Sequence, residues 1–375
     1  MIFKDAALNR VILLVALCIA VACAPRGRIT YDPQAAGVGM VEQVYVGTMR
    51  AALPEGGFGT ERSETPTYAR YDISVPPVRK LGSIDWPPRH GKPDPRRHYL
   101  TTAAKSYPET RAFRKDLAAD LRKTGGEAVV FVHGYNNNFS EGLYRVAQLA
   151  HDLEIPGVEV HYSWPSAANP LGYVYDRDSA IFARDGLSQL LNEIEDAGAT
   201  RILLVAHSMG SALTMEALRS LALRGDKATL AKLSGVILIS PDIDVDVFRE
   251  QAKAIGALPQ PFLIFGSNRD RVLRFSAGLT GQKERLGSLS DLERLADLKV
   301  TFLDVGAFAK GSSHFLVGDS PSLILLLGKI ADVDNVLETE RARRVGLLPG
   351  VVLSVQNATQ IVLQPIATVG NELTR

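Results

Sequence analysis

Short apolar runs alternate with amphipathic segments along most of this chain, and this alternation restricts the possible fold more than any other sequence feature. Runs rich in β-branched residues occupy residues 44–48, 68–75, 128–133, 158–163, 201–206, 236–240, 262–266 and 300–305. The later runs are almost continuously apolar, as in parallel strands covered on both faces. Segments with apolar side chains at three- and four-residue steps separate several runs. We therefore expect an α/β protein with an eight-stranded, mostly parallel sheet flanked by helices.

The remaining segments predict where helices and loops lie. Helices are expected after residue 140, over 176–196, after 208, after 246, over 289–298 and from 321. Between Asp242 and Pro261 there is room for only one helix, so we expect no inserted cap domain there. Residues 83–99, rich in Pro, Arg and Lys, are expected to form an ordered surface loop. Gln, Asn and Pro interrupt the apolar residues 351–369, so residues 335–375 are expected to form a packed, helical C-terminal tail.

Composition excludes several classes of protein. The chain has 375 residues, 46% hydrophobic and 22% charged, which is ordinary for a globular domain. Its 42 Lys and Arg residues against 41 acidic residues give a formal net charge of +1. This balance lacks the excess of positive charge that binding to a phosphate backbone requires. We therefore expect no nucleic-acid partner.

The N-terminus has the layout of an export signal. Lys4 and Arg10 precede an apolar stretch over residues 11–22, which is short for a membrane span. Small residues then lead to Cys23, in a pattern that resembles the bacterial lipobox. We expect residues 1–23 to be a signal peptide, Cys23 to be lipidated, and the protein to be anchored to a membrane of the cell envelope. A plain signal peptide cut near Ala22 or Ala24 is the alternative.

The rest of the domain organisation follows from this assignment. Residues 24–43 mix Pro, Gly and single charges, which predicts a tether, and residues 44–334 are expected to form the catalytic domain. The two cysteines, Cys18 and Cys23, both lie in the predicted leader. The folded body therefore has neither disulfides nor cysteine ligands, and we expect no metal.

The segment around Ser208 carries the sharpest chemical signal. An apolar run ends at Ala206-His207, Ser208 follows, and Gly210 precedes a helical segment. Small residues two positions before and after a serine, between a strand and a helix, are typical of a nucleophile elbow. Ser208 is therefore the predicted nucleophile. The amide of Met209, at the start of the helix, is a predicted donor to a developing oxyanion.

A serine hydroxyl needs a base, and chain order identifies one. After such an elbow, the acid and then the histidine follow the serine in the chain. Of seven histidines only His314 lies downstream, in a Gly/Ser-rich loop after the last apolar run. His314 is therefore the predicted general base.

The orienting acid has two candidates. Asp270 follows the apolar run 262–266, and Asp242 follows the run 236–240. We favour Asp270, because a carboxylate one strand from the histidine loop is best placed to hold the imidazole tautomer. Asp242 remains the alternative acid; with Asp244 it would otherwise cap a helix or form part of the pocket wall.

The loop after the run 128–133 is expected to supply the second oxyanion donor. There the backbone N–H of Tyr135 is the first choice, with Gly134 giving conformational freedom and His133 bracing the loop. Residues 164–178 are the most apolar loop, and we expect them to form the acyl-group wall, although an ordinary packed connection would look similar. The predicted substrate-binding residues are Gly134, Trp164, Tyr173 and His207.

Taken together, these segments resemble the α/β-hydrolase superfamily, and more closely a group of bacterial envelope hydrolases of uncharacterised function. The matching motifs are His133-Gly134-Tyr135-Asn136, Tyr162-Ser163-Trp164-Pro165, Ala206-His207-Ser208-Met209-Gly210, Ser240-Pro241-Asp242-Ile243-Asp244, Ser267-Asn268-Arg269-Asp270 and Ser313-His314. The resemblance covers approximately residues 44–334. It implies carboxylic-ester hydrolase chemistry and names no substrate. The predicted triad acts through an acyl-enzyme and needs no cofactor, and we expect the substrate to be a small-molecule or lipid ester.

Two alternatives stay open from the sequence. The fold could serve a non-catalytic binding module of the envelope, although such a protein would be expected to lose Ser208 or His314. The same triad could also act on amides, thioesters or envelope lipids. Only the pocket distinguishes these substrates.

Overall fold

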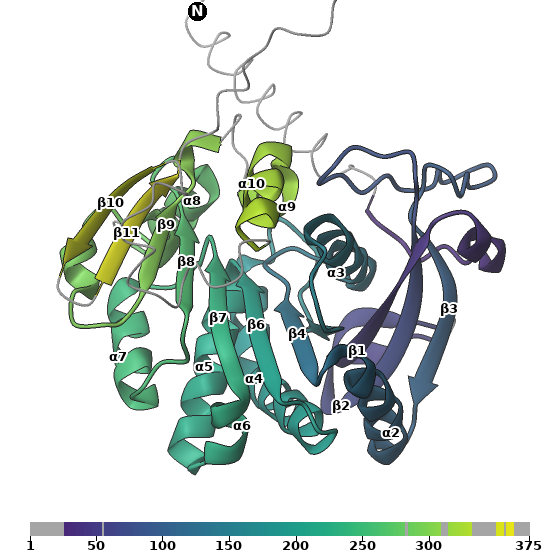
Figure 1. Ribbon diagram of the computed structural model, residues 1–375, viewed down its shortest axis with the longest axis horizontal. Helices are drawn as coiled ribbons and strands as arrows, with labels where there is room; N and C mark the ends of the chain where they lie inside the picture. The colour runs from purple at the N-terminus through teal and green to yellow at the C-terminus, as the bar shows by residue number, and fades with distance from the viewer. Residues whose placement is uncertain are drawn as a thin grey trace, which may run out of the picture.

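A computed structural model of the chain describes residues 26–54, 56–281, 284–308, 314–331, 350–355 and 358–363. The strands in these residues form one sheet with the order β10-β11-β9-β8-β7-β6-β4-β5-β1-β2-β3 (Figure 1). The strands are β1 (Met40–Ala52), β2 (Phe58–Val75), β3 (Leu100–Tyr107), β4 (Glu127–Val132), β5 (Val158–Ser163), β6 (Arg201–His207), β7 (Leu233–Ile239), β8 (Phe262–Gly266), β9 (Thr301–Asp304), β10 (Gly350–Val355) and β11 (Ala358–Leu363). Pairing is parallel from β1 through β5, β4, β6, β7, β8 and β9 to β11, and antiparallel at both ends. The predicted mostly parallel sheet is confirmed.

Helices cover both faces of this sheet. They are α2 (Thr110–Leu121), α3 (Phe139–Leu153), α4 (Tyr173–Asp196), α5 (Met209–Arg224), α6 (Lys227–Lys232), α7 (Val245–Ile255), α8 (Arg271–Leu279), α9 (Leu316–Asp319) and α10 (Pro321–Ala331). Figure 1 shows α4 to α7 on one side of the sheet and α3, α9 and α10 on the other. Between β7 and β8 the chain forms the single helix α7, as expected.

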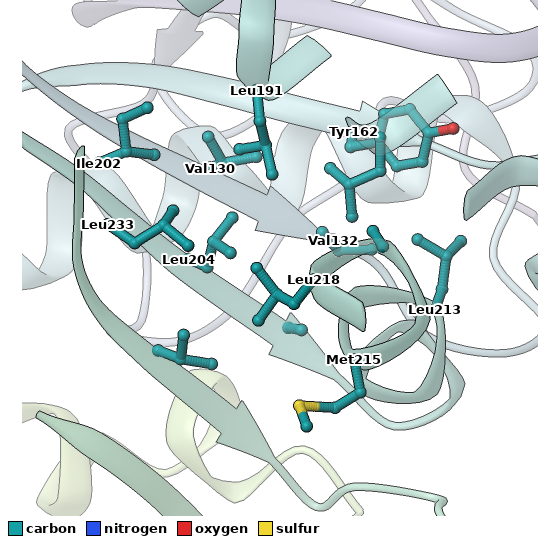
Figure 2. Close-up of a cluster of buried hydrophobic side chains, with 14 of the residues drawn as sticks. Val130, Val132, Tyr162, Leu191, Ile202, Leu204, Leu213, Met215, Leu218 and Leu233 are labelled. Carbon is teal, nitrogen blue, oxygen red and sulfur yellow. The ribbon is translucent and has the colours of Figure 1, made fainter. Parts of the chain in front are cut away.

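Two hydrophobic clusters result from this arrangement, one on each face. Successive residues of β4 alternate between them, so Val130 and Val132 face α4 and α5 while Phe131 faces α3. Figure 2 shows part of the first cluster, where β4 and β6 meet Leu191 of α4 and Leu213 of α5. The alternation explains why these strands are apolar throughout.

The sheet has eleven strands in the described residues, so the expected number of eight is wrong. The edge strand β3 was missed because the middle of the strand is exposed and polar, with Lys105 and Ser106 in place of an apolar run. The expected helical tail over 335–375 is also wrong where it is described. Residues 350–355 and 358–363 form a hairpin, and β11 pairs with β9. The β-branched residues of this segment favour strands, and the open edge of β9 offers backbone partners.

The helix expected over 289–298 is wrong too. A short 3₁₀ helix spans Leu292–Leu295. Leucines at positions 289, 292, 295 and 298 recur every three residues, which is the period of a 3₁₀ helix, and they pack against the core.

The predicted tether packs on the domain over its described part. Gly27 lies so close to Trp86 that a Cβ would be 2.5 Å from the indole ring, and Tyr31 forms a β-bridge with Thr101. A 3₁₀ helix over Pro33–Gly37 buries Ala35 completely, and β1 begins at Met40. The predicted signal peptide and Cys23 lie outside the described residues. No helix within the described part is long and apolar enough to cross a bilayer.

The packing of α2 gives a test of the fold. Phe113 is fully buried, with its ring centroid 4.5 Å from that of Tyr68 and 5.6 Å from that of Tyr107. We expect Phe113→Ala to lower the free energy of unfolding by about 3–5 kcal/mol, because it leaves a cavity between these rings. Urea unfolding followed by circular dichroism measures this, with exposed Lys115→Ala as the control within about 0.5 kcal/mol. Equal effects of the two substitutions would contradict the packing of α2.

Candidate active site

Ser208 occupies a strained turn between β6 and α5. Its backbone has φ 53° and ψ −123°, a conformation that L-residues rarely adopt and that costs about 1–3 kcal/mol. The Ser208 amide donates to the Ile239 carbonyl at 2.9 Å, which holds the turn against β7. A Cβ at Gly210 would lie 2.2 Å from the His133 carbonyl oxygen, so only glycine fits there. Strand, turn and helix therefore have the predicted arrangement.

The structure brings Ser208, His314 and Asp270 together from three separate loops. His314 Nε2 lies 2.9 Å from Ser208 Oγ, and His314 Nδ1 lies 2.6 Å from Asp270 Oδ2. Ser208 and Asp270 are each 3% exposed. With a proton on Nδ1, a neutral His314 donates to the carboxylate and leaves Nε2 free to accept the serine proton.

The first turn of α8 fixes the orientation of Asp270. Asp270 caps this helix, and its Oδ1 accepts hydrogen bonds from the amides of Val272 at 2.9 Å and Leu273 at 3.1 Å. Its other oxygen, Oδ2, contacts the imidazole. One carboxylate thus satisfies two amides of the helix end and holds His314 in place.

The alternative acid, Asp242, has other partners. Its Oδ1 accepts from Arg285 Nε at 3.0 Å and from Ser276 Oγ at 2.7 Å, and its Oδ2 accepts from the Tyr173 hydroxyl at 3.0 Å. Asp242 therefore lies in a buried polar cluster beside Ser208, whose carbonyl accepts from the Asp242 amide at 3.2 Å. Its neighbour Asp244 caps α7. Of the two candidates, Asp270 is the one in contact with the histidine.

Gly134 brings the loop after β4 against the elbow. A Cβ at Gly134 would lie 2.6 Å from His207 Nδ1 and 3.0 Å from Ser208 Cβ. The conformational freedom expected of Gly134 is not used for a positive φ, which in this loop occurs at Asn136 with a φ of 58°. Glycine is needed at 134 because the two backbones approach closely, which leaves Tyr135 next to Ser208.

His133 and Trp164 lie beneath this loop and brace it. Their rings stack with centroids 4.8 Å apart, and Trp164 Nε1 donates to the His133 carbonyl at 2.7 Å. Burial lowers the pKa of His133 well below its usual value, so this imidazole stays neutral. Trp164 has no exposed surface, so its predicted place in the substrate pocket is wrong. Its indole N–H is satisfied inside the protein instead of facing a ligand.

The remaining predicted pocket residues lie around Ser208. His207 packs behind His314, with ring centroids 4.9 Å apart, and against Phe315 at 4.3 Å. Burial and the neighbouring imidazole lower the pKa of His207 well below its usual value. Tyr173 makes an edge contact with Tyr135 at 5.6 Å, and its hydroxyl bonds Asp242. Tyr173 therefore lies in the wall beside Ser208, whereas His207 packs against the His314 ring.

Sequence reasoning missed Arg50, a fully buried residue of β1. Its guanidinium donates to the carbonyls of Asn137 at 2.8 Å, Ser166 at 3.1 Å and Gly59 at 2.9 Å, and to Ser163 Oγ at 2.9 Å. Burial lowers the pKa of Arg50 to about 9. Arg50 thus links the loop after β4 to the loop after β5. The only sequence signal for it was an arginine two residues after the apolar run 44–48.

Asp176 of α4 clamps the same two loops from the other side. Its carboxylate accepts from the amide of Asn136 at 3.0 Å and from the amide of Ala167 and the hydroxyl of Ser166 at 2.6 Å each. Burial raises the pKa of Asp176, which these hydrogen bonds and the charge of Arg50 oppose. Together the two charges hold the backbone that carries Tyr135.

The Arg50 interactions predict a loss of both stability and site geometry on substitution. We expect Arg50→Met to lower the free energy of unfolding by about 3–5 kcal/mol, because it leaves buried acceptors unpaired. The folded fraction should also react with an active-site phosphonate at least about tenfold more slowly, as the loss of one oxyanion donor implies. Denaturation curves and labelling rates measure the two effects. Arg201→Met, at an exposed arginine, is the control, and matching results for both variants would contradict the role of Arg50.

Comparisons with solved structures give distant matches. Aspergillus fumigatus lipase B matches at 16% identity and TM-score 0.39, over 60% of this chain and 56% of the lipase. A Pyrococcus furiosus esterase matches at 10% identity and TM-score 0.36, over 82% and 96%. A Trichoderma reesei cutinase matches at 19% identity and TM-score 0.22, over 36% and 62%. The chain thus spans less than two thirds of the lipase and of the cutinase.

Sequence comparison is more specific. No protein with a curated description matches this sequence. The model of a family described as alpha/beta hydrolase of unknown function (DUF900) matches residues 109–324, more than half of the chain. The matched region contains Ser208 and Asp270 with their supporting loops, and His314. The narrower resemblance to envelope hydrolases stays a prediction. The chain belongs to this family of α/β hydrolases.

Proposed function

We propose that this hydrolase is a serine esterase that cleaves carboxylic esters through Ser208, His314 and Asp270. The proposal rests on one observation, the continuous chain of hydrogen-bonding contacts from the serine hydroxyl through the imidazole to the carboxylate, at 2.9 and 2.6 Å. Membership in a family of α/β hydrolases supports it. No step of the proposed reaction requires a cofactor.

The reaction proceeds by acyl transfer in two steps. His314 Nε2 takes the proton of Ser208 as the serine oxygen attacks the ester carbonyl carbon. The resulting oxyanion accepts hydrogen bonds from the amides of Met209 and Tyr135. Collapse of this intermediate breaks the carbon–oxygen bond to the alcohol, which leaves with the proton from His314. Water then attacks the acyl-enzyme by the same route, releases the acid and restores Ser208.

The two proposed oxyanion donors, the amides of Met209 and Tyr135, come from separate parts of the fold. Met209 is the first residue of α5, so its N–H has no partner within the helix and lies at the positive end of the helix dipole. Tyr135 follows Gly134, whose Cα approaches Ser208 closely.

Amidase, thioesterase and lipase activities use the same groups, and a substrate panel separates them. A binding module would have no need for the strained serine.

We also propose that the chain is exported and anchored to a membrane of the cell envelope through a lipid on Cys23. The apolar residues 11–22 and the small residues before Cys23 support this localisation.

Covalent labelling tests the nucleophile. The purified protein is expected to react with a fluorophosphonate probe and to hydrolyse short p-nitrophenyl esters, and Ser208→Ala is expected to lose both activities. Ser290→Ala, at an exposed serine, should behave as the wild type. If folded wild-type protein shows neither labelling nor turnover, the esterase proposal fails and the binding module is favoured.

Two asparagine variants test the acid. Asp270→Asn should lower kcat about 10³–10⁴-fold, because His314 would lose the carboxylate that sets its tautomer. Asp242→Asn should lower kcat far less, while reducing stability because Arg285 loses its ionised partner. Steady-state kinetics and thermal unfolding of both variants are the measurements. The opposite order of the two kcat values would move the acid to Asp242.

A further inference from the structure

Several large apolar side chains are exposed around the position of Ser208. The loop before α4 and the first turn of α4 contribute Leu171 and Val174, which are 93% and 66% exposed. Helix α8 contributes Val272, Phe275 and Leu279, which are 37%, 66% and 55% exposed. We call these five residues the apolar rim. Isolated exposed apolar residues are common, but a cluster beside a catalytic serine indicates a binding surface.

Hydrogen bonds connect both halves of the apolar rim to the site. Asp242 accepts from Tyr173, which lies between Leu171 and Val174, and from Ser276 of α8. The hydroxyl of Tyr135 donates to the Pro170 carbonyl, directly before Leu171. Both halves of the rim therefore adjoin the polar cluster beside Ser208.

The helical geometry of α8 places its apolar residues next to this cluster. Val272 and Leu279 lie four and three residues from Ser276, so they share its side of the helix, and Phe275 lies four residues before Leu279. Ser276 points to Asp242, whereas Leu273 and Ala277 pack into the protein. The exposed stripe therefore borders the site instead of facing away from it.

The same helix region is basic. Arg269, Arg271 and Arg274 are exposed, and none of them pairs with a carboxylate in the part of the chain that the structure describes. The one acidic residue between positions 267 and 280, Asp270, is buried and holds His314. Basic side chains beside an exposed apolar stripe are suited to a lipid surface with negative charge.

The start of the described chain lies beside the same loop. Arg26 donates to Asn136 Oδ1 at 2.9 Å and to Glu141 at 2.5 Å, and the Gly27 amide donates to Glu141 at 3.0 Å. Asn136 adjoins Tyr135, the proposed oxyanion donor. Cys23 precedes Arg26 by three residues, a reach of roughly 10 Å at full extension. A lipid on Cys23 would therefore hold this side of the protein close to the membrane.

We propose that the apolar rim docks on an anionic lipid surface, so that Ser208 opens toward the membrane. The substrates are then esters of amphiphiles that the membrane presents, a substrate class that rests on the esterase activity proposed above. The exposed rim, the exposed arginines of the α8 region and the position of Arg26 each support this orientation.

Site-directed fluorescence tests the docking without relying on turnover. Both native cysteines lie in the predicted leader, so Leu171→Cys, Phe275→Cys and Leu223→Cys can each be labelled with an environment-sensitive dye, against wild-type protein as the blank. Leu223 is 63% exposed at the far end of α5 and is the matched control. The protein, expressed from its full sequence and processed by the cell, is mixed with vesicles of phosphatidylglycerol and phosphatidylcholine. The lipids carry a nitroxide quencher in the acyl region.

We expect the emission of the dyes at 171 and 275 to shift to shorter wavelength. We also expect these dyes to be quenched at least threefold more than the dye at 223. The same result is expected when each variant also carries Ser208→Ala. Equal quenching at all three positions would overturn the proposal. If the dye at 171 is already in an apolar environment without vesicles, the chain's own N-terminal segment covers the rim, and the docking proposal is overturned. Loss of quenching with inorganic phosphate at constant ionic strength would indicate a site for free phosphate instead. Because Ser208→Ala removes the proposed nucleophile and leaves the rim intact, quenching in that variant tests the docking even if the esterase proposal fails.

Discussion

The candidate site depends on the buried guanidinium of Arg50, which fixes two loops that no regular secondary structure holds. Loops at strand ends leave backbone carbonyls without ladder partners, and burying them unpaired is costly. From β1, Arg50 donates to two such carbonyls, those of Asn137 and Ser166, and also to the Gly59 carbonyl of β2. Asp176 satisfies amides of the same loops from α4. The two opposite charges thus tie both loops to β1 and to α4.

The position of these loops matters because two backbones approach closely at Ser208. Gly134 and Gly210 are positions where a side chain would collide with neighbouring atoms at less than 3 Å. Ser208 is held in a strained conformation between them. The strain persists because the Ser208 amide and carbonyl both have partners on or after β7. The packing of the backbone around Ser208 thus fixes the position of its hydroxyl relative to His314.

Much of this could be predicted from local signals. The parallel strands were recognisable because burial on both faces requires continuous apolar runs, as in β6, where Leu204 lies in one hydrophobic cluster and Val205 packs against the other. Edge strands escaped recognition because one face or both lie in solvent, as in β3, and because a short β-branched hairpin such as β10 and β11 resembles an amphipathic tail. The segment near Leu292 was expected to form an α-helix and forms a 3₁₀ helix, because apolar residues at an i, i+3 spacing fit both kinds of helix. Trp164 was expected at the pocket because aromatic residues line pockets, yet its contacts with His133 bury it.

The sequence by itself determined the class of the fold, the position of the elbow at Ser208 and the identity of its histidine partner, since one histidine follows the elbow in the chain. These features depend on local periodicity and chain order. Only the tertiary structure decided which of two aspartates meets His314, why residue 134 must be glycine, and that Arg50 supports the loop after β4. Those outcomes depend on which atoms from distant segments share one buried volume, and such proximity leaves no pattern in a single sequence.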